Sequence, residues 1–191
     1  FTFYFVGNYD EKTLLPLIEQ YIASLPNNGF KLKNKEIPYA KGEVKNNFTK
    51  AMANPQTQAS EIWSTKLPFS MQNMVLADVT SRLLEMQYLR TIREQLSAAY
   101  HAGATFGMLR DFDDKASIIS ITANAGLNPE KADTAITYFF KGVEEVEKQV
   151  DAADLQKVKE ILLKQAGVDE KNNAYWLGVL ANYTGLGFDN H

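Results

Sequence analysis

The sequence predicts an α+β fold of two layers, in which helices pack on one face of a mostly antiparallel sheet. Strand-like segments occur in pairs, and longer segments with apolar residues at helical spacing follow them. The strand–helix–strand alternation of a parallel sheet is absent from the sequence. Of the 191 residues, 45% are hydrophobic and 12% are aromatic, which is sufficient for one large core. We therefore expect residues 1–191 to form a single domain.

A strand and a helix are expected at the beginning of the chain. Residues 1–6 are aromatic or β-branched and predict a buried strand, which a Gly-Asn pair ends. Asp10 is a suitable N-cap, because its carboxylate can accept hydrogen bonds from the free amides of a first helical turn. The helix that follows ends at residues 26–29, and its apolar face is formed by Leu14, Leu17, Ile18, Tyr21, Ile22 and Leu25. Residues 30–42 carry many lysines and predict an exposed connection.

Two further strands and a long helix are expected in the middle of the chain. Residues 43–51 and 57–67 predict strands that an Asn-Pro pair separates. Ser70 is expected to cap a helix that extends to about Leu96. The predicted buried face of this helix consists of Leu76, Val79, Leu83, Met86, Leu89, Ile92 and Leu96.

A hairpin and three helices are expected in the last part. Residues 99–108 and 116–125 are rich in strand-forming residues and predict an antiparallel hairpin. Three helical segments follow: from Asn128 and Pro129 onward, from Asp151 or Asp154 to about Gly167, and over residues 173–183. The predicted buried face of the first consists of Ala132, Ala135, Ile136, Phe139, Phe140, Val143 and Val146.

Composition excludes several classes of protein. The chain has 20 Lys and Arg against 23 Asp and Glu, with a formal net charge of −3, and it lacks the basic stripe that would bind nucleic acid. No apolar run approaches the length that spans a bilayer. The absence of cysteine excludes a disulfide framework, a thiolate zinc site and a cysteine nucleophile.

Motifs that would let the chain catalyse hydrolysis by itself are missing. The histidines, His101 and His191, are far apart, and neither His-x-x-Glu-His nor His-Glu-x-x-His occurs, so no helical pair of imidazoles can hold zinc. His101 is expected to be a partly buried strand residue and not a ligand or triad member. The acidic residues Asp111, Asp113 and Asp114 lack the glycine and distal glutamate of a calcium loop and predict a solvated hairpin turn. We expect no metal site in this chain.

One segment, residues 93–100, joins the long helix to the hairpin. Arg93 lies at helical spacing from Leu89 and Leu96, so its guanidinium either extends past an apolar face or reaches a polar partner. A tight turn could bring Arg93 and Tyr100 to the same edge, where their donors would suit a peptide carbonyl or a tetrahedral oxyanion. Spacing alone leaves open the alternative that the arginine stabilises the helix end and the tyrosine closes the core.

Three motifs resemble the C-terminal-type, non-zinc domains of the pitrilysin/insulinase-type zinc peptidases, the inverted zincins. Residues 93–100, REQLSAAY, resemble the family's Arg-Glu-x-x-Gly-Leu-Ala-Tyr signature and keep its arginine-to-tyrosine spacing of seven, with serine and alanine in place of the glycine and leucine. Residues 1–8, FTFYFVGN, are similar to the strand that opens such domains, and residues 21–26, YIASLP, to the family's Tyr-Leu-x-x-Leu-Pro. The motifs occur in the expected order over nearly the whole chain.

The resemblance implies a LuxS/mitochondrial processing peptidase-like metallohydrolase fold and a part in a larger enzyme. Paired domains of this family close around a peptide, and the N-terminal-type domain alone carries the zinc motif. By this resemblance Arg93 and Tyr100 would bind substrate, and Tyr100 would also be catalytic, donating to the oxyanion formed when zinc-bound water attacks. The full-length protein would be a zinc metalloendopeptidase, with zinc in the partner domain and no cofactor in this chain.

We therefore predict a substrate-binding, non-zinc domain of an endopeptidase that cleaves peptides in a closed chamber, inactive by itself. The implied partners are a peptide and a zinc-bearing domain of the same or a paired chain. An exposed apolar face is expected where that domain packs, so the fragment should self-associate. The chain begins at Phe1 in a strand-like segment, which favours a fragment of a larger multidomain protein.

Two alternatives and the compartment stay open at this point. The chain could belong to a catalytically inactive homologue that binds peptides or acts as a scaffold. It could also be an independent hydrolase with an unrecognised site. The family favours the periplasm or the cell envelope, but no residue of the sequence indicates a compartment.

Overall fold

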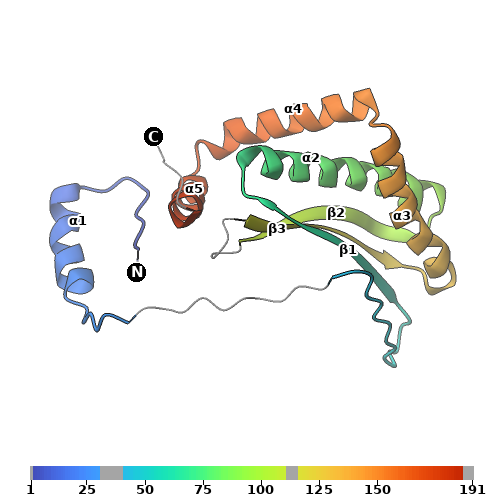
Figure 1. The fold of residues 1–191 in the computed structure, drawn as a ribbon, viewed down its shortest axis with the longest axis horizontal. Coiled ribbons are helices and arrows are strands. Elements are labelled where there is room, and N and C mark those ends of the chain that lie inside the picture. The colour runs from blue at the N-terminus through green and yellow to red at the C-terminus, as the bar shows by residue number, and fades with distance from the viewer. Residues whose placement is uncertain (1, 31–40, 111–115, 187–191) are drawn as a thin grey trace. The chain divides into compact units, whose positions relative to one another are not determined.

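The structure is a computed structural model that describes residues 2–30, 41–110 and 116–186. Its elements follow in the order α1 (Glu11–Ile18), η1 (Glu19–Ala23), β1 (Thr57–Pro68), α2 (Met71–Tyr88), η2 (Leu89–Gln95), β2 (Ala99–Arg110), β3 (Ala116–Leu127), η3 (Pro129–Lys131), α3 (Ala132–Lys148), α4 (Ala152–Asp169) and α5 (Asn173–Leu186) (Figure 1). The segments η1 and η2 are π-helical, and η3 is a 3₁₀ turn. Helices with an antiparallel sheet confirm the predicted α+β class.

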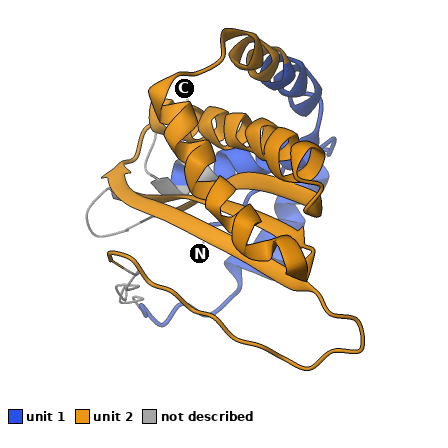
Figure 2. Ribbon diagram, turned by 90° about the vertical axis from the view of Figure 1, so that its right-hand side faces the viewer, with its two compact units in different colours: residues 1–33, 161–191 blue, residues 34–160 orange. Residues whose placement is uncertain are grey.

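The chain divides into two compact units, which Figure 2 colours differently. The sheet unit comprises residues 34–160, and the terminal unit comprises residues 1–33 and 161–191. The interpretation of residues 1–191 as one domain stays a prediction. Among the described residues, no helix is both long enough and apolar enough to span a membrane.

The sheet unit is built on three antiparallel strands in the order β1-β3-β2. Strands β2 and β3 form the predicted hairpin, and both are longer than the sequence suggested. Strand β1 agrees with the strand expected at residues 57–67 and pairs with the other side of β3, from Thr57 opposite Leu127 to Pro68 opposite Ala116. The central strand is therefore the second strand of the hairpin.

Helices α2 and α3 cover one face of this sheet (Figure 1). The buried residues between the layers are mostly alanines, whose short side chains let the helices lie close to the strands. Tyr88 and Phe139 are fully buried with ring centroids 5.2 Å apart, and the Tyr88 hydroxyl donates to the Phe139 carbonyl at 2.9 Å. Burial raises the pKa of Tyr88 above its ordinary value. This pair fixes α2 against α3.

The start of α2 agrees with the prediction, and its buried face agrees in part. The Ser70 hydroxyl accepts a hydrogen bond from the Asn73 amide at 3.1 Å, as a cap should. Leu76 was expected in the core and is 54% exposed, whereas the buried positions of α2 are Ala77, Ser81, Leu83, Leu84 and Tyr88. Leu83, and Ile92 of η2, are buried as predicted, whereas the small residues Ala77 and Ser81 are also buried and cannot be found by a search for large apolar residues. Phe140 of α3 is likewise 44% exposed and contacts the Trp63 ring edge-on.

Two predicted strands are wrong. Residues 2–6 and residues 43–51 form no strand in the structure, and all of residues 41–56 are exposed. Phe3 and Phe5 were expected to be buried and are exposed. A strand is stable only beside a hydrogen-bonding neighbour, and neither segment pairs with another among the described residues. Most of the connection expected at residues 30–42, and the acidic residues of the hairpin turn, lie outside the described residues.

The terminal unit is helical and leaves its apolar residues exposed. Asp10 caps α1 as predicted, because its carboxylate accepts from the Lys12 amide at 3.1 Å and the Thr13 hydroxyl at 2.9 Å. Helix α5 confirms the helix expected at residues 173–183. None of this unit's residues whose burial is described is buried. Its exposed large apolar residues include Phe3, Phe5, Leu15, Leu17, Tyr21, Leu25, Phe30, Ile161, Leu163, Val168, Tyr175, Trp176 and Leu177. Exposed apolar surface was expected of a domain that packs against another.

Candidate functional site

Arg93 lies in η2, the π-helical continuation of α2. The Leu96 amide donates to the Thr91 carbonyl at 3.0 Å, which is the spacing of a π-helix. Because a π turn takes up more residues than an α turn, α-helical spacing no longer predicts which face a side chain occupies. Ile92 is buried, whereas Arg93 is exposed and makes no hydrogen bond or ion pair within the described residues. Of the two alternatives for Arg93, the structure therefore agrees with a guanidinium that extends to solvent and not with one that reaches a polar partner among the described residues.

Ser97 turns the chain from η2 into β2. Its φ is 48°, in the left-handed region that favours glycine, which is the residue that the resembling signature has at this position. The Ala98 amide then donates to the Ile92 carbonyl at 3.0 Å and closes the helix end. The tight turn predicted between helix and strand is thus present, and it holds Ser97 in a strained conformation.

Replacing Ser97 by glycine should stabilise the chain by up to about 1 kcal/mol, because relief of the left-handed strain exceeds the added entropy of the unfolded glycine. For a chain of this size, that corresponds to a rise of about 2–4 °C in Tm, measured by thermal unfolding. Ser97→Ala keeps the Cβ atom and is the matched control, which should show no such rise. Equal Tm values for the glycine and alanine variants would contradict the proposed strain.

Tyr100 is the extra residue of a β-bulge at the start of β2. Ala99 pairs with Leu127 and His101 pairs with Gly126, so Tyr100 stands between two pairs without a partner of its own. Its side chain is 99% exposed. A bulge can turn a side chain away from the regular alternation of a strand. The phenol is therefore a free hydrogen-bond donor, and the alternative that Tyr100 closes the core is wrong.

Arg93 and Tyr100 belong to one corner of the sheet unit. Arg93 comes from the last turn of η2, Tyr100 from the first residues of β2, and the turn at residues 96–98 joins them. Both are exposed, so neither side chain is part of the buried core. A guanidinium and a phenol are each suitable donors for a peptide carbonyl or a developing oxyanion.

His101 follows Tyr100 and is exposed, although it was expected to be partly buried. A Cβ atom on Gly103 would come within 3.2 Å of the His101 Nε2 atom, so the glycine leaves space for the imidazole. Within the described part of the chain, no group of three or more His, Asp or Glu side chains could hold a metal ion. His191 lies outside the described residues.

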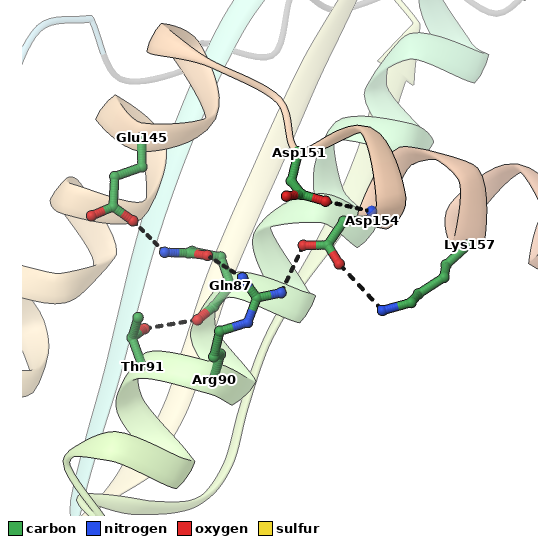
Figure 3. A network of polar contacts seen from close by, with 7 residues as sticks. All are labelled: Gln87, Arg90, Thr91, Glu145, Asp151, Asp154 and Lys157. Carbon is green, nitrogen blue, oxygen red and sulfur yellow. Dashed lines mark hydrogen bonds and ion pairs between the residues drawn. The ribbon is translucent and has the colours of Figure 1, made fainter.

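A polar network that sequence analysis missed anchors the helix leading into the corner (Figure 3). The Arg90 guanidinium contacts the Asp154 carboxylate at 2.6 Å, and Lys157 lies 3.6 Å from the same group. The hydrogen bond from Arg90 holds the pKa of the Asp154 carboxyl below its usual range. Gln87 donates to Glu145 of α3. The network thus joins α2 and η2 to α3 and to the start of α4.

The same network decides which of the two aspartates begins α4. Asp151 caps α4, because its carboxylate accepts from the Asp154 amide at 2.9 Å. Asp154 is buried and pairs with Arg90 across 64 positions of sequence. Side-chain pairs this distant leave no periodic signal in a single sequence, which is why the pattern of apolar residues could not reveal them.

The comparison with known families decides the identity of the fold. A family model described as the peptidase M16 inactive domain matches residues 1–162. The chain belongs to this family. The resemblance to the non-zinc domains of pitrilysin/insulinase-type peptidases is thereby confirmed. Among curated proteins, none matches the sequence.

Two solved protease structures share the fold of this M16 inactive domain. A protease from Helicobacter pylori matches with a TM-score of 0.65 and 19% identity, over 95% of this chain and 44% of that chain. The periplasmic protease PqqL from Escherichia coli matches with a TM-score of 0.61 and 20% identity, over 93% of this chain and 19% of that chain. At these identities the likeness concerns the fold. The chain thus spans less than half the length of either structure.

The described part of the M16 inactive domain does not fit the zinc ion of the peptidases that it resembles. His101 is the one histidine among the described residues, and it belongs to no described group of three or more side chains that could hold a metal ion. Zinc prefers nitrogen or sulfur donors with carboxylates, and this chain has no cysteine. The roles of Arg93 and Tyr100 in the M16 inactive domain stay predictions.

Proposed function

We propose that this domain forms the non-zinc side of a peptidase chamber and presents Arg93 and Tyr100 to the peptide. The observation that carries the proposal is the 99% exposed phenol of Tyr100, held on a bulge seven residues after Arg93, which is exposed and unpaired among the described residues. Membership in the peptidase M16 inactive-domain family supports it. Exposed donors at the junction of a helix and a strand are available to a ligand.

The face of the sheet opposite to α2 and α3 suits an extended peptide. Side chains alternate along each strand, so the positions between the buried alanines point to this second face. Apart from the glycines, they are exposed or half-buried, and most are uncharged and polar: Gln58, Ser60 and Ser64 of β1, Thr122 and Asn124 of β3, and His101 and Thr105 of β2. The apolar residues Ile62, Leu109 and Ile118 and the charged Lys66 belong to the same face. Hydroxyl and amide groups can bond to a peptide backbone whatever its sequence. This surface would form part of the chamber wall.

Each residue of the corner has a distinct role in this proposal. The Arg93 guanidinium would bind a carbonyl or carboxylate of the peptide with charge-assisted hydrogen bonds. The Tyr100 hydroxyl would donate to the scissile carbonyl oxygen as it gains negative charge. Zinc chemistry would be supplied by another domain, of the same or a paired chain, against which the exposed apolar residues of this chain pack. The domain alone would not hydrolyse a peptide.

Arg93→Ala in the full-length protein tests substrate binding at this corner. Loss of charge-assisted hydrogen bonds worth roughly 1.5–3 kcal/mol should raise KM about 10–100-fold, with kcat changed much less. The measurement is steady-state hydrolysis of fluorogenic peptides. Arg82→Ala is the control, because Arg82 pairs with Asp78 at 2.8 Å within α2 and is not part of the corner.

Three results would decide against the proposal. An Arg93→Ala enzyme with unchanged KM would remove Arg93 from the binding site. Hydrolysis by the isolated chain would favour an independent hydrolase. A full-length protein that binds peptides without cleaving them would favour the alternative of an inactive, peptide-binding homologue.

A further inference from the structure

The connection between β3 and α3 holds the turn that precedes Tyr100. The Lys131 ammonium donates to the Leu96 carbonyl at 2.8 Å and to the Ser97 carbonyl at 3.4 Å. The Asn128 amide donates to the Ala98 carbonyl at 2.8 Å. Every carbonyl of the turn at residues 96–98 is therefore bound by one four-residue segment, 128–131, that lies about thirty positions later in the sequence.

Physical chemistry favours a lysine at this place. The last carbonyls of a helix have no partner within the helix and carry the negative end of its dipole. A lysine near that end satisfies them and is attracted by the dipole. Here it also bonds to a serine in a strained, left-handed conformation, which needs surrounding contacts to persist.

Lys131 is itself held in place. The Asn128 side chain accepts from the Glu130 amide at 3.0 Å, and the Lys131 amide donates to the Asn128 carbonyl at 3.0 Å, which closes η3. The residue before this segment, Leu127, pairs with Ala99 in the sheet. The chain is thus bound on both sides of the bulge, at residues 96–99 and from His101 onward, and Tyr100 projects between them.

We propose that Lys131 is a positioning residue for the Tyr100 hydroxyl. It would not touch the substrate. Because Lys131 binds the Leu96 and Ser97 carbonyls to η3, it would limit the directions in which the bulge can orient the phenol. The inference rests on the proposed function of Tyr100, because only a reaction that needs the hydroxyl at a defined place is sensitive to its position.

A double-mutant cycle on the full-length protein tests this role. Lys131→Met, which removes the ammonium and keeps an unbranched side chain, should lower kcat about tenfold and change KM less than about threefold. Lys131→Arg keeps a charged donor and should restore most of kcat. In Tyr100→Phe the position of the ring no longer matters, so adding Lys131→Met should lower kcat no further. Lys148→Met, at the other end of α3, is the matched control and should leave kcat unchanged.

The outcomes separate this inference from the proposed function. If Tyr100→Phe lowers kcat and Lys131→Met does not, the positioning role is wrong and the proposed function stands. If the two effects multiply in the double variant, Lys131 does not act through Tyr100, and the inference again fails. If Tyr100→Phe leaves kcat unchanged, Tyr100 is outside the catalytic machinery, and both proposals fail.

Discussion

Replacing Tyr100 by phenylalanine should lower kcat of the full-length protein about 10²–10³-fold, with KM changed much less. The side chain is 99% exposed, so the hydroxyl contributes nothing to the packing of this domain and its loss should not disturb the fold. The variant removes a single donor. If that donor serves the oxygen that becomes charged during hydrolysis, its energy is realised in the transition state and not in the bound substrate.

Steady-state kinetics on a fluorogenic peptide, together with thermal unfolding, would measure this effect. Tyr21→Phe is a suitable control, because Tyr21 is also exposed, at 64%, and lies in η1 of the terminal unit. It should leave kcat and Tm unchanged. A Tyr100→Phe enzyme with the kcat of the wild type would exclude Tyr100 from catalysis, and a reduced Tm would show that the residue has a structural role instead.

Gly142→Ala should destabilise the 191-residue chain by about 1–2 kcal/mol. A Cβ atom on Gly142 would lie 2.5 Å from Cε1 of Tyr88, which is closer than such atoms can approach. The Tyr88 ring is fully buried, and its hydroxyl donates to the Phe139 carbonyl. The ring therefore cannot move aside without losing core packing and this hydrogen bond. Overpacking typically costs about 1–3 kcal/mol and exceeds the gain of up to about 1 kcal/mol that alanine brings to a helix.

Urea unfolding of the variant would measure this change. Gly167→Ala in α4 provides a control of opposite sign, because no atom lies within 4 Å of the position that its Cβ would occupy. That variant gains helix propensity without a clash and should raise the unfolding midpoint. If Gly142→Ala were as stabilising as Gly167→Ala, the close contact between α2 and α3 at Tyr88 would be wrong.

Much of the fold could be predicted from local chemistry. Asp10 and Ser70 have side chains that bond to the amides of a first turn, and both cap the helices that the sequence assigned to them. The hairpin could be predicted from sequence, because its two segments are rich in strand-forming residues and close together in the chain. By contrast, residues 2–6 and 43–51 have strand-like composition and form no strand, since a strand also needs a neighbour that composition does not specify.

The candidate site could be selected from sequence, but its geometry could not. The spacing of Arg93 and Tyr100 within a family-like motif pointed to the corner. The π-helical turn, the left-handed Ser97 and the bulge at Tyr100 follow from how the helix end meets the sheet, and the exposure of both side chains could not be predicted from spacing. The hydrogen bond from Lys131 to Leu96 joins residues 35 positions apart, which no periodicity predicts.

The sequence by itself determined the class of fold, the family-like motifs and the lack of a zinc motif, because capping, amphipathic periodicity and short motifs are encoded within a few neighbouring residues. Only the tertiary structure decided that the phenol and the guanidinium are exposed, that Ser97 is strained, and that Lys131 and Asp154 bind elements distant in the chain. Those properties depend on which surfaces meet when the helices pack on the sheet. Which surfaces meet depends on the free energy of the whole fold and not on any one segment.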